Sequence, residues 1–162
     1  MNVKRGERKN VPKPGRLFLD TNIYIVGTMA PDDPEGIILR WLIGETVIED
    51  YPRPEVVISN ELQAQIARVA RRVRHKDWAG HVLSLVWRMR IVNVVVSEKE
   101  VEQVELAGTI PREDAGIYLA ACEGKATCFV SENRKLLKAA VAQTNDFECL
   151  TPAEFVVRYL EE

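Results

Sequence analysis

Five short apolar runs recur along the sequence, and helical patterns occupy the segments between them. Runs rich in Val, Ile and Phe are typical of strands that are buried on both faces of a parallel sheet. Strands that alternate with helices in this way predict βαβ units, and hence a five-stranded parallel sheet flanked by helices in three layers. The predicted strands are Arg16–Asp20, Glu55–Ser59, Ile91–Val96, Thr127–Ser131 and Phe147–Leu150.

Side chains that can cap a helix stand where several predicted helices begin. Asp33-Pro34, Asn60-x-x-Gln63, Ser97-x-x-Glu100 and Thr151-Pro152-x-Glu154 each offer such a cap. From Asn60 onward the apolar residues fall on one helical stripe, so we expect this helix to pack on the sheet with its other side in water. Helices are predicted at Asn60–Arg74, Asp77–Arg90, Arg112–Glu123 and Asn133–Ala142.

Length and composition predict one globular domain. The chain has 162 residues, of which 46% are hydrophobic and 28% are charged, enough for one core. Residues 1–15 are polar and basic and predict a flexible tail ahead of a domain at residues 16–162. The longest strongly apolar run, Ile91–Val96, is far shorter than the ~20 residues of a membrane helix. We therefore expect no membrane segment.

The balance of charges and the small number of His and Cys residues limit which ligands and metal ions the chain can bind. With 22 Lys and Arg against 24 Asp and Glu, any contact with nucleic acid has to come from local patches. Cys122, Cys128 and Cys149 lack Cys-x-x-Cys spacing and fit buried thiols in a reducing cytoplasm. His75 and His81 are the only histidines, so oxygen atoms would have to hold a divalent cation.

Acidic or amide side chains stand at four places where a predicted strand ends or the next helix begins. They are Asp20, Glu61, Asp114 and the pair Glu132-Asn133. Because the strand ends of one polarity lie along one edge of a parallel sheet, we expect these groups to converge there. Each acid taken singly also fits a helix cap or a first-turn charge, which contributes roughly 0.3–1 kcal/mol. Their recurrence favours a shared site.

Crowded carboxylates repel one another unless a cation neutralises them. Oxygen ligands without imidazole or thiolate favour Mg²⁺ or Mn²⁺. Such an ion can polarise a water molecule that attacks a phosphodiester. The pattern therefore predicts metal-dependent hydrolysis of a phosphodiester.

Four segments carry a family resemblance: LFLDTNIYI (Leu17–Ile25), VISNELQAQI (Val57–Ile66), IPREDAGIYLAACEGKATCFVSENRKLL (Ile110–Leu137) and FECLTPAEFVVRYL (Phe147–Leu160). Together they resemble the PIN-domain family, and within it the VapC-type toxin ribonucleases. The first and third are the most specific pair, because the family places one acid after its first strand and another in a Pro-x-x-Asp-Ala motif. The resemblance covers the chain from about Arg16 to Leu160.

The resemblance implies a PIN-like three-layer fold and a Mg²⁺- or Mn²⁺-dependent endoribonuclease. Its catalytic, metal-binding acids correspond to Asp20, Glu61 and Asp114. Thr21, Asn22 and Ser131 correspond to polar residues that hold ligands or waters around the metal. Glu132 and Asn133 are further candidate metal ligands. Many relatives have Asp where this chain has Asn133, whose neutral oxygen would bind a second metal more weakly unless Glu132 turns inward.

A basic stripe is predicted on the helix that begins near Glu61. It comprises Arg68, Arg71, Arg72 and Lys76, with His75 between them. Arg68 and Arg72 lie seven and eleven residues beyond Glu61, roughly on the same side of a helix. An RNA strand bound there through its phosphates would lead into the acidic site. A solvated helix face explains the same charges.

The three Trp residues can stack on RNA bases, but their spacing favours packing in the core or an interface.

Partners and rival functions complete the expectations. The resemblance implies a homodimer and an antitoxin protein whose tail occupies a groove on this chain. The candidate groove residues are Ile37, Ile38, Trp41 and Leu42. Burial of these side chains in the core explains the same apolar pattern equally well. One rival is a degenerate PIN module that binds RNA or a protein without cutting. Another is a structure-specific DNA nuclease, although such enzymes generally carry more acids and longer insertions.

Overall fold

All five predicted strands are present in the computed structural model, which describes residues 12–108, 110, 112–143 and 147–161. The strands are β1 (Arg16–Leu19), β2 (Glu55–Ser59), β3 (Ile91–Val94), β4 (Cys128–Val130) and β5 (Glu148–Leu150). Four of them are shorter than predicted by one or two residues at an end. The predicted tail lies mostly outside the described residues, so its flexibility stays a prediction.

The strands form one parallel sheet in the order β3-β2-β1-β4-β5. The chain winds from β1 outward through β2 to β3, and then returns to the other side of β1 to form β4 and β5. The direction of winding therefore reverses between β1 and β4. Ligands of open α/β sheets bind outside the carboxyl ends of the strands at such a reversal.

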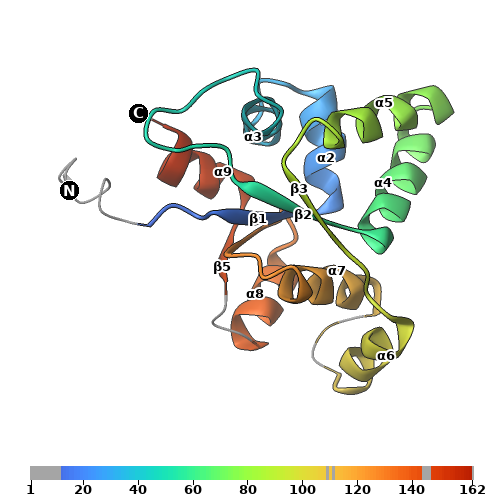
Figure 1. Ribbon diagram of the computed structural model, residues 1–162. Helices are drawn as coiled ribbons and strands as arrows, with labels where there is room; N and C mark the ends of the chain where they lie inside the picture. The colour runs from blue at the N-terminus through green and yellow to red at the C-terminus, as the bar shows by residue number, and fades with distance from the viewer. Residues whose placement is uncertain (1–11, 109, 111, 144–146, 162) are drawn as a thin grey trace.

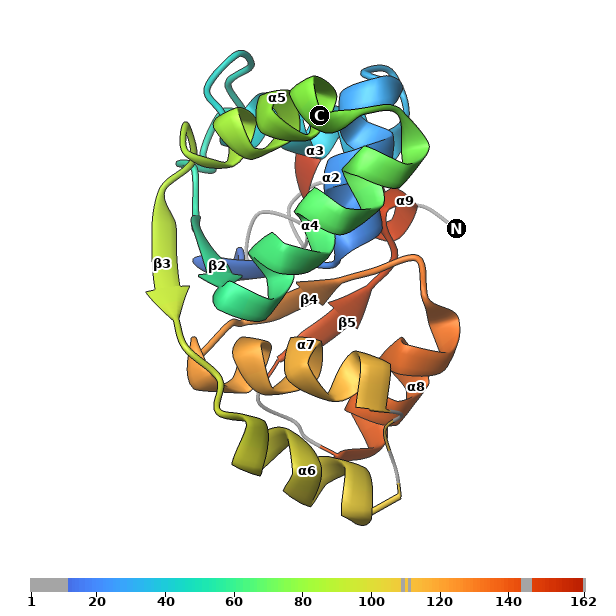
Figure 2. The same cartoon turned by 90° about the vertical axis from the view of Figure 1, so that its right-hand side faces the viewer.

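Helices cover both faces of the sheet, which gives the three predicted layers (Figure 1). One layer holds α2 (Thr21–Met29), α3 (Pro34–Leu42), α4 (Asn60–Val73), α5 (Lys76–Val86) and α9 (Pro152–Phe155), which continues into the π-helical turn η1 (Val156–Leu160). The other layer holds α6 (Glu98–Leu106), α7 (Arg112–Glu123) and α8 (Arg134–Gln143). Figure 2 shows the two layers above and below the sheet.

Of the four helices predicted by their residue ranges, α7 has the predicted bounds, whereas α4 ends one residue early, α8 is shifted by one residue, and α5 begins one residue early and ends four residues early. Helix α4 ends at Val73, and Arg74 leaves the helical region with φ −131° and ψ −84°. Helix α5 ends at Val86 and not at Arg90, because the amides of Arg88 and Met89 donate to the carbonyls of Leu85 and Val86 in tight turns. These turns reverse the chain so that it can enter β3.

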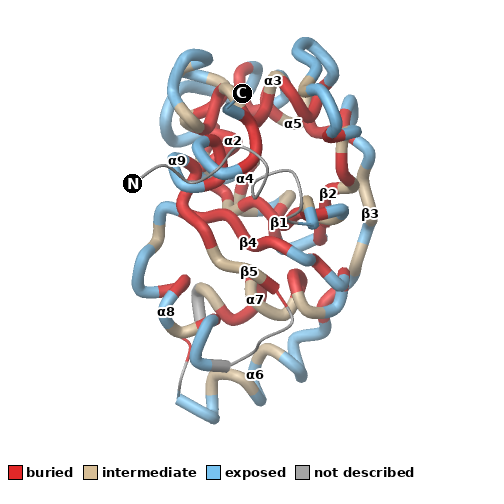
Figure 3. The backbone as a smooth tube through the Cα atoms, turned by 90° about the vertical axis from the view of Figure 1, so that its left-hand side faces the viewer, coloured by how far each residue is buried: buried red, intermediate tan, exposed pale blue. Residues whose placement is uncertain are grey.

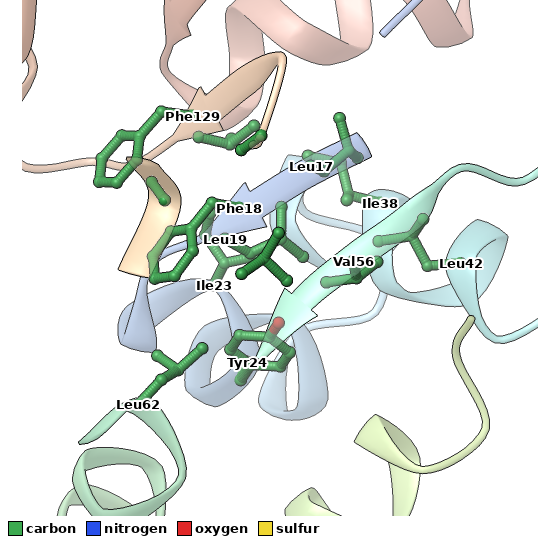
Figure 4. Close-up of a cluster of buried hydrophobic side chains, with 14 of the residues drawn as sticks. Leu17, Phe18, Leu19, Ile23, Tyr24, Ile38, Leu42, Val56, Leu62 and Phe129 are labelled. Carbon is green, nitrogen blue, oxygen red and sulfur yellow. The ribbon is translucent and has the colours of Figure 1, made fainter. Parts of the chain in front are cut away.

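The core lies around β1, whose last three residues are completely buried (Figure 3). Phe18 stacks on Phe129 of β4, with ring centroids 5.2 Å apart. On the other face of the sheet, Ile23 and Tyr24 of α2 pack beside Leu19 (Figure 4). Because side chains that flank Asp20 are buried on both sides, the position of its backbone is fixed by the core.

The predictions for the tryptophan and cysteine side chains are confirmed only in part. Trp41 and Trp78 are buried, as core packing requires, whereas Trp87 is 58% exposed. No disulfide joins any two of the three cysteines, and Cys128 is buried as predicted, whereas Cys122 and Cys149 are only half-buried. Within the described ranges, no helix is long and apolar enough to cross a lipid bilayer.

Candidate active site at the carboxyl edge of the sheet

Asp20 stands at the reversal point between β1 and β4. Its amide donates to the carbonyl of Val130 at 3.0 Å, which fixes the residue at the end of both strands. Its Oδ1 accepts from the amide of Thr21 at 2.8 Å, and its Oδ2 accepts from the Ser131 hydroxyl at 2.7 Å. An ionised carboxylate offers about four lone-pair positions, so acceptor capacity remains for a ligand.

Ser131 connects this carboxylate to the next helix. The side chain is completely buried at the end of β4, and besides donating to Asp20 it accepts from the amide of Asn133 at 2.9 Å. The Asn133 Oδ1 in turn accepts from the amide of Leu136 at 3.1 Å. Asn133 therefore caps the start of α8. One oxygen is engaged in this cap, and the metal-ligand role of Asn133 stays a prediction.

Thr21 joins the site to α4. Its hydroxyl donates to Oε1 of Gln65 at 2.8 Å. Gln65 lies one turn after Glu61, on the same face of the helix. Sequence reasoning missed Gln65, although its four-residue spacing from Glu61 was the available signal. Asn22, by contrast, is exposed, and its side chain forms no hydrogen bond with a described residue.

Glu61 and Asp114 lie on two helices, α4 and α7, that pack on each other. Glu61 is exposed in the first turn of α4, where its side chain lies against Gly116 of α7. A methyl group built on Gly116 would stand 3.1 Å from the Glu61 Cγ. Asp114 is half-buried near the start of α7. The structure thus brings Asp20, Thr21 and Ser131 into one hydrogen-bonded group, with Glu61 beside the helix that carries Asp114.

The donors in this group are carboxylate, hydroxyl and amide oxygens, which suit Mg²⁺ or Mn²⁺ in kind. Among the described residues, however, no three Asp, Glu, His or Cys side chains lie close enough together to hold a metal ion jointly. Magnesium commonly takes one or two protein carboxylates and keeps several waters. The oxygen donors therefore fit a hydrated ion, and the shared three-acid site stays a prediction.

The metal-ligand role of Glu132 stays a prediction, and the structure places its exposed side chain near Glu35 of α3. Burial raises the pKa of Glu35, and the neighbouring Glu132 carboxyl reinforces this through a side-chain hydrogen bond and like-charge repulsion. Glu35 occupies the first turn of α3 and reads in the sequence as an ordinary first-turn charge. The sequence does not distinguish an exposed glutamate in the first turn of a helix from one that a distant loop covers.

The basic stripe is divided between two helices. Arg68, Arg71 and Arg72 are exposed on α4, whereas Lys76 begins α5 beyond the break at Arg74. None of the four forms an ion pair with a described residue. His75, between them, caps α5, because its Nδ1 accepts from the amide of Trp78 at 3.1 Å.

A pocket of about 330 Å³ opens between α8, β5 and the start of α9, and sequence reasoning missed it. Its polar lining residues are Arg134, Lys138, Thr151 and Glu154, and its apolar ones are Leu137, Val141 and Cys149. A backbone hydrogen bond connects Ser131 with the segment that lines the pocket, because its amide donates to the carbonyl of Leu150, which stands between the lining residues Cys149 and Thr151. The four-residue spacing of Arg134 and Lys138 was the available signal.

The candidate antitoxin groove residues belong to the core. Ile38, Trp41 and Leu42 of α3 are at most 1% exposed, and Ile37 is half-buried against them. Burial therefore accounts for this apolar stripe, and a groove lined by these four side chains is wrong.

The sequence matches no family model and no curated protein. Its structure is similar to a chain in the crystal structure of VapBC2 from Rickettsia felis bound to a promoter DNA fragment, with a TM-score of 0.56 and 17% identity. It is also similar to a chain of VapBC-1 from nontypeable Haemophilus influenzae, with a TM-score of 0.55 and 16% identity. The matches cover 84% and 85% of this chain and 98% of each of those chains. The predicted PIN-like fold is confirmed.

Proposed function

We propose that this chain is a metal-dependent endoribonuclease and the toxin component of a toxin–antitoxin pair. The observation that carries the proposal is the Asp20 carboxylate, which Ser131 and Thr21 hold at the reversal point of a PIN-like sheet. The likeness to VapBC structures supports it at the level of the fold. A carboxylate needed only as a helix cap would not require a buried hydroxyl from another strand.

Asp20 would be the principal ligand of Mg²⁺ or Mn²⁺, together with Glu61 or Asp114. When bound, such an ion supplies a polarised water and stabilises negative charge on the phosphate oxygens. The residues of this chain position the ligands. Ser131 fixes the carboxylate of Asp20, and the contact of Thr21 with Gln65 fixes the distance between α2 and α4. Groups of this kind commonly change metal affinity or activity by about 10–100-fold when removed.

Arg68 and Arg72 would guide the RNA substrate. They continue the face of α4 that carries Glu61 and Gln65, and both are exposed. Phosphate contacts of this kind give affinity and salt dependence without reading sequence. Arg71 and Lys76 would add phosphate contacts at the flank of the same surface.

The decisive experiment measures cleavage of RNA by the purified protein with Mg²⁺ or Mn²⁺. We expect Asp20→Asn and Asp114→Asn to reduce cleavage to background and Ser131→Ala to reduce it by about 10–100-fold. The matched control is Asp77→Asn, which removes an exposed acid from the first turn of α5. Equal activity in Asp20→Asn, Asp114→Asn and the control would exclude the nuclease.

The second candidate function is a non-catalytic module that binds RNA. It is favoured by the engagement of Asn133 in the cap of α8 and by the absence of a preformed three-acid group among the described residues. Calorimetry with Mn²⁺ separates the two functions. Salt-dependent retention of RNA without binding of Mn²⁺ would support the module and contradict the enzyme.

An antitoxin protein is the proposed partner, by analogy with the VapBC assemblies. Because Ile38, Trp41 and Leu42 of α3 are buried in the core, we expect the antitoxin to bind elsewhere on the surface. Co-expression with the protein encoded by the neighbouring gene, followed by co-purification, tests this partner. A chain that expresses without toxicity and copurifies with no such protein would contradict the toxin–antitoxin assignment.

A further inference from the structure

We propose that the pocket between α8, β5 and α9 is a subsite that binds one guanine nucleotide of the RNA substrate, close to the phosphate that is cleaved. The base would lie against the apolar wall of the pocket, and Glu154 and Arg134 would hydrogen-bond to its edge. This inference rests on the proposed ribonuclease function and adds a base preference to it. The phosphate contacts proposed for α4 cannot provide such a preference, because phosphates carry no sequence information.

Three elements contribute matching faces to the pocket. Residues at offsets of three, four and seven positions share one face of α8, and they are Arg134, Leu137, Lys138 and Val141. Cys149 and Thr151 are two residues apart and therefore point to the same side of the extended chain at the end of β5. Glu154 completes the lining from the first turn of α9. The volume of about 330 Å³ is at the lower end of the range for ligand sites, about 300–1,000 Å³, and suits one small ring system.

The pocket lies two strands away from Asp20 along the carboxyl edge of the sheet. Leu19 of β1 pairs with Val130 of β4, and Val130 pairs with Leu150 of β5. Asp20 and Thr151 directly follow the outer two of these partners. Because neighbouring strands lie about 4.8 Å apart, the backbones of Asp20 and Thr151 are separated by about 10 Å. The helix α4 follows β2 on the other side of β1, so one RNA strand can contact α4, the Asp20 group and the pocket in turn.

The wall of the pocket offers apolar surface to a base. Leu137 is buried, and Val141 is 59% exposed although it is apolar. Burial raises the pKa of Cys149 to about 11, so its thiol is uncharged at neutral pH and extends the same surface. Proteins recognise unstacked bases by covering their faces with apolar or aromatic groups and by hydrogen-bonding to their edges.

The polar groups of the pocket provide an acceptor beside a donor. Oε1 of Glu154 accepts from the amide of Thr151 at 3.0 Å, whereas Oε2 accepts no hydrogen bond from a described residue. The hydrogen bonds from Thr151 lower the pKa of Glu154, and the nearby Arg134 adds to this, so the carboxylate is ionised and can only accept. The guanidinium of Arg134 can only donate, and it forms no ion pair with a described residue.

Guanine is the base whose edge matches this pair. It presents two adjacent N–H donors, at N1 and N2, next to the O6 acceptor. Glu154 would accept from the two donors, and Arg134 would donate to O6, which is a common arginine contact in nucleic-acid complexes. Adenine and cytosine place a ring-nitrogen acceptor beside a single amino donor, and uracil places its single donor between two acceptors. Lys138, which also forms no ion pair with a described residue, would contact the phosphate.

The experiment measures binding without cleavage, so it does not depend on nuclease activity. Fluorescence anisotropy with the Asp20→Asn protein compares a short oligouridylate that contains one guanosine with the same RNA containing adenosine or inosine, which lacks the N2 amino group. We expect the guanosine RNA to bind about 10–100-fold more tightly than the adenosine RNA, with the inosine RNA between them. Arg134→Gln and Glu154→Gln should each remove most of this preference.

The controls separate the subsite from general effects of charge and stability. Lys135→Gln removes a positive charge from the same helix, but Lys135 is exposed and does not line the pocket, so the preference should be unchanged. Thermal melts establish that the Glu154→Gln protein is folded during the measurement, since this substitution alters a capping box. Independently, guanosine monophosphate should shift the methyl NMR resonances of Leu137 and Val141 in the Asp20→Asn protein, whereas adenosine monophosphate should not.

Equal affinity for the guanosine and adenosine RNAs, or a preference that persists in both Arg134→Gln and Glu154→Gln, would overturn the subsite. A protein that cleaves RNA without preferring guanosine contradicts the subsite alone, whereas one that prefers guanosine but does not cleave supports the subsite and contradicts the nuclease. If Arg134→Gln abolishes copurification of an antitoxin and leaves RNA binding unchanged, the pocket holds a protein, and the proposal is overturned as well.

Discussion

Asp20 occupies a helix-cap position, yet its hydrogen bonds differ from those of an ordinary cap. A capping side chain normally accepts from the second or third residue of the helix. Asp20 accepts instead from Thr21, the first residue, and its other oxygen accepts from the buried Ser131. Capping alone does not explain a carboxylate anchored by a neighbouring strand. The cap and the proposed metal ligand are therefore compatible roles of one side chain.

Gly116 provides a residue-scale test of the position of Glu61. We expect Gly116→Ala to lower RNA cleavage, because its methyl group would stand 3.1 Å from the Glu61 Cγ and displace the proposed metal ligand. Helix α7 itself should form at least as well, since Ala exceeds Gly in helix propensity by about 0.8–1 kcal/mol. The control Gly80→Ala lies in α5 with nothing within 4 Å of the added methyl group, so it should not affect activity. Steady-state cleavage rates and thermal melts distinguish the two effects.

Glu35 predicts how stability depends on pH. Burial raises the pKa of Glu35 above its ordinary value of 4.5, so the folded protein binds this proton more tightly than the unfolded chain does. The stability conferred by the protonated carboxyl is present below pH 4.5 and is lost as the pH rises through the folded-state pKa. Glu35→Gln, which stays neutral, should therefore raise the melting temperature at pH 8 and leave it unchanged near pH 4. Equal shifts at both pH values would contradict a buried, protonated Glu35.

At the scale of the element, the start of α9 is a reciprocal capping box. Thr151 accepts from the amide of Glu154, and Glu154 accepts from the amide of Thr151. Thr151→Ala should lower the free energy of unfolding by about 1 kcal/mol, whereas Thr151→Ser keeps the hydroxyl and should have a smaller effect. Urea denaturation at neutral pH measures both. An unchanged unfolding midpoint for Thr151→Ala would show that the box does not stabilise the native state.

The same box should weaken in acid. The hydrogen bonds to Thr151 lower the pKa of Glu154, so its contribution to stability is present above its ordinary value of 4.5. This contribution is lost as the pH falls through the lowered pKa. The destabilisation caused by Glu154→Gln should accordingly be larger at pH 7 than at pH 3, which is the opposite trend to that of Glu35→Gln.

Elements whose signals are local were predicted from the sequence, and those set by distant contacts were not. The five strands and the caps of α6 and α9 follow from apolar runs and from residues a few positions apart. The predicted cap of α4 at Asn60 is wrong, because the hydroxyl of Ser59 accepts from the amide of Leu62 and Asn60 is already the first residue of the helix. The predicted end of α5 at Arg90 was wrong, because the apolar pattern continues to Met89 although the chain already turns toward β3 after Val86. The π-helical turn after Phe155 has no signal in a pattern read at 3.6 residues per turn.

In the candidate site, too, some residues were predicted from the sequence and the contacts between distant segments were not. Asp20 was identified because a strand end in a parallel sheet fixes where it lies, whereas Ser131 was identified only through the family resemblance. The contacts of Thr21 with Gln65 and of Glu132 with Glu35 join segments that only the packing of α3 and α4 brings together. From the sequence alone, such residues are interpreted as helix caps or surface charges. Their partners depend on how the helices pack, and the local sequence pattern does not predict that packing.

At the scale of the whole molecule, the near balance of charge determines how RNA can bind. The net charge is −2, so the protein as a whole does not attract a polyanion, and binding depends on patches such as Arg68 and Arg72. Each phosphate contact to a single strand contributes about 0.7 to the slope of log affinity against log salt. We therefore expect Arg68→Gln and Arg72→Gln each to lower the slope by about 0.7.

The control for this experiment is Lys125→Gln. Lys125 is exposed between α7 and β4, at the edge of the sheet opposite Asp20, and its loss changes the net charge by the same amount. If RNA follows α4 toward Asp20, Lys125→Gln should leave the slope unchanged, since its charge is beyond the ~8 Å over which exposed charges act at physiological salt. Equal slopes for all three variants would mean that RNA senses only the total charge, and the path along α4 would be excluded. Fluorescence anisotropy with catalytically inactive Asp20→Asn protein measures binding without cleavage.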